Sequence, residues 1–203
     1  MILIGRYASP FVRRVGISMT LMGLAFEHRS ISALTDGDKI RAHNPMGKVP
    51  ALVMEDGEVL VDSTAILDSL CETTPGQMLL PAKGLERRQV LQQCAVMTNA
   101  LDKAVNFVYE HMKRPPEKVH QPVVEGLVDQ VTAGLVMIEK ILALGNMPGG
   151  KDMTLGGVTA AVGWRFLTKA MPAAADPERF YLLAAHSQAC EAMPAFVNCQ
   201  PEV

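Results

Sequence analysis

The character of the sequence changes near residue 80, and this change constrains the fold more than any other feature. Before it, short apolar runs alternate with residues typical of turns and helix starts. After it, the apolar residues recur at the three- and four-residue spacing of long helices. The sequence therefore predicts an α+β domain over residues 1–76, a linker over 77–84 and an all-helical domain over 85–203.

Turn and cap residues predict the order of elements in the first domain. Ser9-Pro10 begins a helix after a short apolar strand, and Asp56-Gly57 joins the two strands of an antiparallel hairpin. Asp62-Ser63 then begins another helix. The expected order is β-α-β-α-β-β-α, with strands at 2–5, 26–31, 50–54 and 58–61 and helices at 10–22, 35–43 and 63–74.

Helical periodicity continues through the second domain. Apolar stripes predict two long antiparallel helices over 90–108 and 124–142, joined through Arg114-Pro115-Pro116. Two shorter helices are expected over 154–169 and 177–192, with tryptophan and phenylalanine side chains turned inward.

Composition excludes several classes of protein. With 49% apolar and 20% charged residues, the 203-residue chain has enough apolar material for a sizeable core, unlike a fibrous or disordered chain. A net charge of −2 argues against nucleic-acid binding, and we find no signal peptide and no membrane-spanning stretch. The four cysteines and five histidines lack metal-ligand spacing, so we expect no metal, no disulfide framework and a reducing, cytoplasmic compartment.

Three segments of the first domain have the residue types of a binding site. In the first, Ala8-Ser9-Pro10-Phe11, the Ser9 hydroxyl stands at the start of a helix, where unpaired N–H groups and the helix dipole favour an anion. A plain structural N-cap explains the same serine.

The second and third segments each have two interpretations as well. Val49 precedes Pro50 and is therefore extended, and a cis bond there would turn its N–H and C=O outward to hold a peptide. The alternative is an edge strand that begins with proline. Asp62 and Ser63 can hold the amino and carboxylate groups of a zwitterion, or they form a doubled helix cap.

In this order, with a hairpin between the second and third, the segments resemble the thioredoxin-like N-terminal domain of the glutathione S-transferase family. The helical remainder is similar to that family's C-terminal domain. Ala8-Ser9-Pro10-Phe11 most resembles the serine-type tau branch, whose relatives in the omega branch carry cysteine at the serine position.

The resemblance implies a role for each matching residue. Ser9 hydrogen-bonds to the glutathione sulfur, and Val49, before the family's cis-proline, holds the cysteinyl unit with its backbone. Asp62 and Ser63 hold the γ-glutamyl end, while Lys48 lies near the glycyl carboxylate or is a solvated lysine. The implied substrate-binding residues are Phe11, Lys48, Val49, Pro50, Asp62 and Ser63.

The chain departs from the family pattern at two positions. Asp62 stands where the family more often has glutamate, so its carboxylate reaches less far. Thr154 is followed at the third position by Gly157 rather than by the aspartate that closes a capping box, so the reciprocal bond is lost.

The resemblance implies a transferase that conjugates the glutathione thiolate to a small apolar electrophile, with a role in detoxification and a homodimeric assembly. Ser9 and Val12 replace the cysteines of a redox motif, which disfavours glutaredoxin-type turnover. Two alternatives stay open: a non-catalytic dimeric interaction or regulatory protein, and an isomerase or dehalogenase that uses glutathione as a cofactor. Tyr109, Met112 and Trp164 are candidates for the electrophile pocket or belong to core and surface, and Asp102 is a candidate contact to a neighbouring subunit's γ-glutamyl group.

Overall fold

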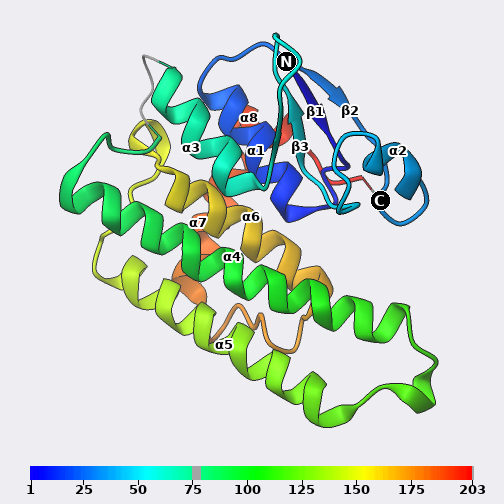
Figure 1. Cartoon of the computed structure of the whole chain (residues 1–203). Helices are drawn as coiled ribbons and strands as arrows, with labels where there is room; N and C mark the ends of the chain where they lie inside the picture. Colours follow the sequence, from blue (N-terminus) through cyan, green and yellow to red (C-terminus); the bar gives the residue numbers. More distant parts are fainter. Residues whose placement is uncertain (75–78, 203) are drawn as a thin grey trace. The chain divides into compact units, whose positions relative to one another are not determined.

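The computed structural model describes residues 1–74 and 79–202 and divides the chain into two compact units. One unit comprises Met1–Arg87 together with Glu191–Val203, and the other comprises Arg88–Cys190 (Figure 1). Residues 75–78, where the predicted first domain ends and the linker begins, lie outside the described residues. The domain boundaries at 76 and 85 therefore stay a prediction.

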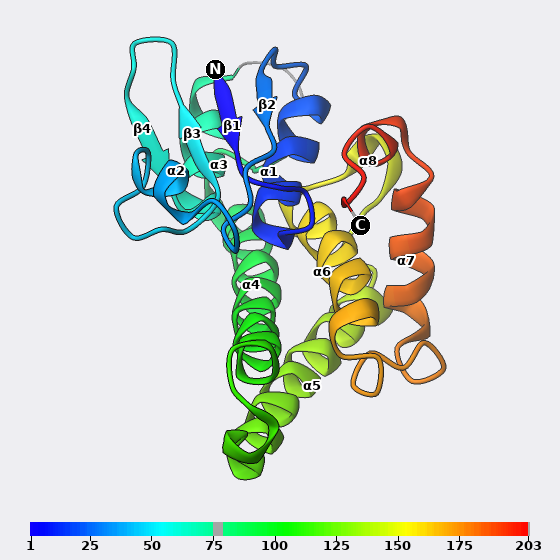
Figure 2. The ribbon, with the colours of Figure 1, turned by 90° about the vertical axis from the view of Figure 1, so that its right-hand side faces the viewer.

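A four-stranded mixed sheet organises the first unit (Figure 2). The strand order is β2-β1-β3-β4, with β2 parallel to β1 and β3 antiparallel to both β1 and β4. The predicted β-α-β-α-β-β-α order and the thioredoxin-like fold are confirmed. The elements are β1 (Ile2–Ile4), α1 (Pro10–Leu21), β2 (Glu27–Arg29), α2 (Gly37–Arg41), β3 (Ala51–Val53), β4 (Val59–Val61) and α3 (Ser63–Thr73).

The two faces of the sheet bury different residues because side chains alternate along a strand. Ile4 and Ala51 face one side, where they form a buried cluster with Ile40 of α2. Leu3 and Leu52, the next register pair, are also fully buried and face the opposite side. Helices α1 and α3 pack against each other and contact β1 and β4, so helices cover both faces.

Helices make up the second unit. The two long helices that periodicity predicted extend beyond the predicted apolar stripes at both ends. Leu101, Leu135 and Val162 contribute fully buried side chains from three of the helices. The elements are α4 (Gly84–Met112), α5 (Gln121–Ala143), α6 (Leu155–Ala170) and α7 (Tyr181–Glu191), with 3₁₀ turns at Pro116–Lys118 and Gly150–Asp152.

The last predicted helix begins later than expected. The backbone carbonyl of Asp176 accepts the Phe180 N–H at 3.0 Å and its carboxylate accepts the Glu178 N–H at 2.9 Å. These bonds close a separate turn, so α7 begins at Tyr181 instead of residue 177. A further short helix, α8 (Pro194–Val197), follows α7 and belongs to the first unit.

Within residues 1–74 and 79–202, no helix combines the length and apolar character needed to cross a membrane. The same residues contain no group of three or more histidine, cysteine or acidic side chains that could hold a metal ion. None of the four cysteines forms a disulfide within this part of the chain.

Candidate functional site

The register of the sheet brings the three predicted segments to one end of it. Ile4 pairs with Ala51 and Ala51 pairs with Val61, so these three residues form one row. The chain leaves β1 just after Ile4, enters β3 at Ala51 and leaves β4 just after Val61. The loop before α1, the Val49-Pro50 pair and the start of α3 therefore meet at this end of the sheet.

A glycine at this end allows the backbones to approach closely. Gly5 has a φ of +124°, and a Cβ atom built on it would lie 2.9 Å from the Cβ of Val49 and 2.6 Å from a methyl carbon of Val12. Any other side chain would push the loop away from Val49. The absence of a side chain at Gly5 therefore allows the first and second segments to lie close together.

The Ser9 hydroxyl does not behave as a plain N-cap. Ser9 has the extended backbone of an N-cap residue, and its carbonyl accepts the Arg13 N–H at 2.9 Å. Its side chain, however, makes no capping hydrogen bond to the first turn of α1, which is what a structural N-cap serine normally provides. The half-buried hydroxyl stands at the positive end of the helix with its donor available to a bound anion.

A second hydroxyl near the same loop points inward instead. The ring of Tyr7 is 7% exposed, stacks on His28 at a centroid distance of 3.9 Å and hydrogen-bonds with the Cys199 thiol. Burial and that hydrogen bond raise the pKa of Tyr7 far above its ordinary value. A Cβ on Gly16 would lie 2.8 Å from the Tyr7 oxygen, so this glycine makes room for the phenol. Tyr7 is thus part of the core, and Ser9 is the residue whose hydroxyl stands at the helix start.

The turn before β3 presents the backbone of Val49. The Val49-Pro50 peptide bond is cis, and among the described residues no hydrogen bond engages the Val49 N–H or C=O. Asn44, which is 2% exposed, braces this turn: its side-chain amide donates to the Lys48 carbonyl at 2.9 Å and its oxygen accepts the Met46 N–H at 3.1 Å. The Lys48 side chain is exposed. Asn44 was not among the predicted site residues, although an Asx turn before proline is a recognisable signal.

Asp62 combines a helix cap with a strained backbone. Its carboxylate accepts the Thr64 N–H at 2.7 Å, so the predicted capping role is observed. Its φ of +68° is unusual for a residue with a side chain, a conformation that costs about 1–3 kcal/mol and is concentrated at functional sites. The residue is exposed, so its second carboxylate oxygen remains open to a ligand.

Ser63 has a buried cationic partner that the sequence did not reveal. Ser63 and Arg14 are 2% and 1% exposed, and the Arg14 guanidinium donates to the Ser63 oxygen at 3.0 Å. Because that oxygen accepts from Arg14, its own proton remains to be donated to an acceptor. The one available signal was an arginine pair inside an otherwise apolar helix face, since buried arginine requires partners.

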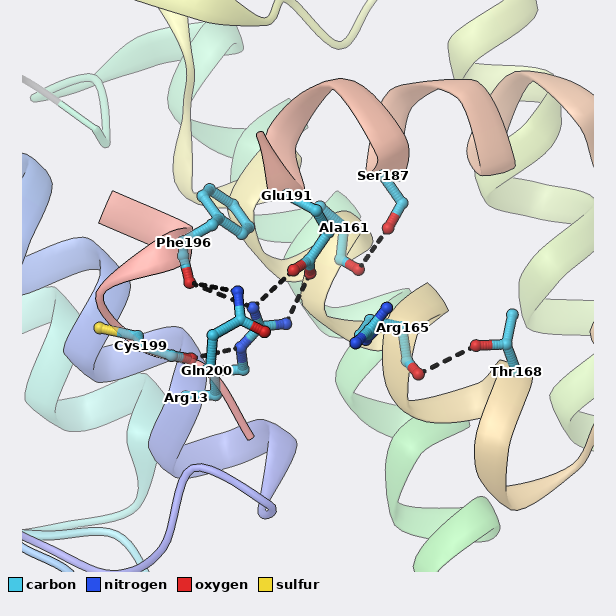
Figure 3. A network of polar contacts seen from close by, with 9 residues as sticks. All are labelled: Arg13, Ala161, Arg165, Thr168, Ser187, Glu191, Phe196, Cys199 and Gln200. Carbon is cyan, nitrogen blue, oxygen red and sulfur yellow. Dashed lines mark hydrogen bonds and ion pairs between the residues drawn. The ribbon is translucent and has the colours of Figure 1, made fainter. Parts of the chain in front are cut away.

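Arg13, the residue before Arg14, anchors the C-terminal segment, residues 191–202, to α1 (Figure 3). Its guanidinium donates to both Glu191 carboxylate oxygens, at 2.6 and 2.7 Å, and to the Cys199 carbonyl at 2.7 Å. A longer bond of 3.4 Å reaches the Phe196 carbonyl. Two parallel bonds to one carboxylate are the strong, geometrically specific form of an ion pair.

The same C-terminal segment also contacts the loop before α1 through Glu202. The Ala8 N–H donates to one oxygen of the Glu202 carboxylate at 2.9 Å, and the Ser30 hydroxyl donates to the other at 2.6 Å. Partial burial alone would raise the pKa of Glu202, but these hydrogen bonds and the charge of Arg6 outweigh it and lower the pKa. Sequence reasoning did not identify this contact.

The predicted electrophile residues occupy different surroundings. Trp164 is 5% exposed and packs edge-on against Phe180, with 6.2 Å between ring centroids, inside the second unit. Tyr109 lines a groove of about 560 Å³ between α4 and α5, with the Lys113 ammonium 3.8 Å from its ring centre. Trp164 does not line this groove. Met112 is 60% exposed near it at the end of α4.

The two remaining candidates lie on helix surfaces. Phe11 is partly exposed in the first turn of α1. Asp102 is exposed on α4, where the Lys103 ammonium lies 3.5 Å from its carboxylate. The structure therefore gathers Ser9, Val49, Pro50, Asp62 and Ser63 at one end of the sheet, and their roles toward a ligand stay predictions.

Comparison with known proteins points to one family. Residues 3–78 match the family model for the glutathione S-transferase N-terminal domain. The chain is 28% identical to glutathione S-transferase Z2 of Arabidopsis thaliana, over 97% of this chain and 88% of that protein. It is also 28% identical to the maleylacetoacetate isomerase of Pseudomonas aeruginosa, over 73% of this chain and 75% of that protein.

Solved structures extend the match to the whole chain. A glutathione transferase family member from Pseudomonas fluorescens Pf-5 with bound glutathione is 26% identical, with a TM-score of 0.86 and coverage of 100% of this chain and 99% of that one. A second structure from that organism, with bound S-(propanoic acid)-glutathione, has a TM-score of 0.84 at 26% identity, and each chain is covered over 100% of its length. The likeness thus includes the helical region as well as the thioredoxin-like domain.

Proposed function

With the glutathione S-transferase family supported by its N-terminal domain model, by curated relatives and by solved structures, we propose that this protein is a glutathione transferase of the serine type. It joins the thiolate of glutathione to a small apolar electrophile. The observation that carries this proposal is the Ser9 hydroxyl, which stands at the start of α1 and makes no capping bond. The Ala8–Phe11 segment resembles that of the serine-type tau branch, whose relatives in the omega branch carry cysteine at the serine position.

The other gathered residues fit the rest of the tripeptide. The N–H and C=O of Val49, which no described residue engages, suit the backbone of the cysteinyl unit. The Asp62 carboxylate and Ser63 hydroxyl suit the γ-glutamyl amino and carboxylate groups. Lys48 is exposed beside this end and suits the glycyl carboxylate. The Pseudomonas fluorescens relative holds glutathione, which supports the same ligand here.

Ser9 would act as a hydrogen-bond donor to sulfur. A thiol with a pKa of about 8.5 is mostly protonated at neutral pH, whereas the thiolate is the nucleophile. A hydrogen bond to a charged acceptor contributes about 1.5–3 kcal/mol, and each pKa unit corresponds to about 1.4 kcal/mol, so one donor lowers the thiol pKa by about one to two units. The N-terminus of α1 adds to this stabilisation.

The substitution Ser9→Ala tests this role. We expect turnover with chlorodinitrobenzene to fall at least about tenfold and the pH profile to move to higher pH, because the thiolate loses its donor. Glutathione affinity, measured by calorimetry, should stay within a few-fold. An unchanged pH profile would contradict the assignment of Ser9.

The same variant separates a catalytic hydroxyl from a structural cap. Removing a working N-cap costs about 0.5–2 kcal/mol, but the Ser9 hydroxyl caps nothing, so Ser9→Ala should leave the free energy of unfolding unchanged. Thr154→Ala is the matched control, because the Thr154 side chain accepts the Gly157 N–H at 3.4 Å at the start of α6. Loss of stability in Ser9→Ala equal to that in Thr154→Ala would favour the plain-cap interpretation.

A second candidate function is a glutathione-dependent isomerase, because maleylacetoacetate isomerases are among the relatives. There the thiolate adds to a double bond, the carbon skeleton rotates, and the thiolate leaves again, so glutathione is not consumed. Counting glutathione distinguishes the two reactions. Conjugation consumes one glutathione per product, whereas isomerisation converts substrate at constant glutathione.

The alternative of a non-catalytic interaction or regulatory protein is tested by the same measurements. Retention on immobilised glutathione without conjugation or isomerisation would favour it.

We also propose a homodimer, supported by a groove of about 350 Å³ between α4 and α5 that exposes Met137 and small side chains of Ala95 and Ala133. Sedimentation velocity measures that assembly. The cytoplasmic compartment and the role in detoxification belong to this proposal.

A further inference from the structure

The Glu202 carboxylate occupies a site of two converging donors. The Ala8 N–H lies in the loop that precedes α1, and the Ser30 hydroxyl directly follows β2, so two separate segments contribute one donor each. Each donor serves a different carboxylate oxygen, at 2.9 and 2.6 Å. Such a pair matches the two oxygens of a carboxylate and leaves a neutral alkyl group without a partner.

The surroundings of this site also favour a negative charge. The charge of Arg6 acts on the Glu202 carboxylate and helps to lower its pKa. The acid is only partly buried, and the two residues that donate to it are exposed. A carboxylate from another molecule can therefore reach the same donors once Glu202 leaves.

The site is adjacent to the residue proposed to hold the sulfur. Ala8 and Ser9 are consecutive residues, so their Cα atoms are about 3.8 Å apart. A substituent that carries a carboxylate two or three bonds from the sulfur spans a distance of this order. An acid attached to the sulfur, or about to be attached, is thus within reach of Ala8 and Ser30.

We propose that the Ala8 N–H and the Ser30 hydroxyl form a carboxylate subsite for the electrophile, which Glu202 fills in the free protein and an acid-bearing electrophile takes over. This proposal rests on the proposed function, because it places the electrophile beside Ser9. It assigns a substrate class, small electrophiles with a carboxylate near the reacting carbon, and it makes the C-terminal segment an internal competitor for them.

Competition with Glu202 has a measurable consequence. When the binding-competent form is a fraction of the molecules, the apparent affinity is reduced by that fraction. If Glu202 leaves the subsite open in about one molecule in ten, removing it strengthens the binding of an acid about tenfold. A neutral ligand that does not use the two donors gains nothing from the same change.

Two adducts of glutathione with equal chain length provide the test: S-(propanoic acid)-glutathione and S-propylglutathione. Calorimetry gives the affinity of each for the whole protein and for Glu202→Ala. We expect Glu202→Ala to tighten the acid adduct about tenfold and to change the propyl adduct less than about twofold. Glu55→Ala is the matched control, because Glu55 is an exposed glutamate in the turn between β3 and β4.

A second substitution examines the donors themselves. Adding Ser30→Ala to Glu202→Ala should weaken the acid adduct at least about threefold relative to the propyl adduct, since one carboxylate oxygen loses its donor. The proposed subsite would be overturned if the ratio of the affinities for the acid and propyl adducts were the same in Glu202→Ala as in the wild type. It would also be overturned if adding Ser30→Ala left that ratio unchanged. Failure of glutathione itself to bind would instead refute the proposed function, so the two results are distinguishable.

Discussion

Removing the Glu191 carboxylate should lower the free energy of unfolding more than removing any exposed acidic side chain does. Arg13 is 1% exposed and its guanidinium makes two short bonds to Glu191. In Glu191→Ala the positive charge stays buried and loses its counter-charge. The Cys199 and Phe196 carbonyls still accept from Arg13, so part of its hydrogen bonding survives.

The size of the effect follows from this residual bonding. Breaking a buried ion pair by removing one partner costs about 3–5 kcal/mol, and the surviving carbonyl acceptors favour the lower end, about 3 kcal/mol. For a chain of this size each kcal/mol shifts the melting temperature by about 2–4 °C, so we expect a decrease of about 6–12 °C. Urea unfolding followed by circular dichroism gives the free energy, and a thermal melt gives the temperature.

Two further variants make this prediction refutable. Asp38→Ala removes one partner of the exposed pair with Arg41, where the atoms are 3.3 Å apart, and should leave stability within experimental error. Replacing both the buried Arg13 and the partly buried Glu191, as Arg13→Met with Glu191→Leu, should recover most of the loss because no unpaired charge remains. A loss below about 1 kcal/mol in Glu191→Ala, or no recovery in the double variant, would refute the reasoning.

Two other predictions concern glutathione affinity and pH. Asp62→Ala should weaken glutathione binding about tenfold with a smaller change in kcat, because its contact is remote from the bond being made. Asp62→Asn keeps an acceptor for the Thr64 N–H, so calorimetry on it isolates the charge, and unaltered affinity in both variants would remove Asp62 from the site. Burial lowers the pKa of His186, against a smaller opposing effect of its bond to the Gly157 carbonyl. The folded state therefore binds the His186 proton less tightly than the unfolded chain does. The free energy of unfolding is highest above about pH 6.5, and it falls as the pH drops below that value because the unfolded chain takes up the proton first. From about pH 7.5 to about pH 5, the free energy of unfolding should decrease more in the wild type than in His186→Gln. Equal decreases in the two proteins would contradict this role of His186.

Local signals predicted the order of elements but not the length of every strand. A six-residue strand was predicted over 26–31, whereas β2 comprises Glu27–Arg29 alone. This edge strand pairs with Ile2–Ile4 of β1, and its length is set by the three residues available on that partner. The length of this edge strand therefore depends on its pairing with β1 more than on local sequence signals.

The same distinction separates the site residues that the sequence identified from those it missed. Ser9, Val49 and Asp62 each carry a signal in their immediate neighbours, a proline or a helix start. The contacts of Arg13 with Glu191 and of Ala8 with Glu202 join residues 178 and 194 positions apart, so the local sequence does not identify the partner. Burial of Trp164 follows from helical periodicity, but periodicity does not tell a core position from a pocket wall.

Helix α1 connects these local and distant features. Its N-terminus presents Ser9, and its next turn carries Arg13 toward the C-terminal segment and Arg14 toward Ser63. Because Arg13 and Arg14 belong to the helix that begins just after Ser9, a shift of the C-terminal segment acts on α1 through Arg13 as well as on the Ala8 loop through Glu202. The C-terminal segment is thus held at two points around the proposed sulfur site, one buried and one exposed. The buried contact resists movement, so exchange of Glu202 for an incoming acid requires movement of Glu202 but not of Glu191.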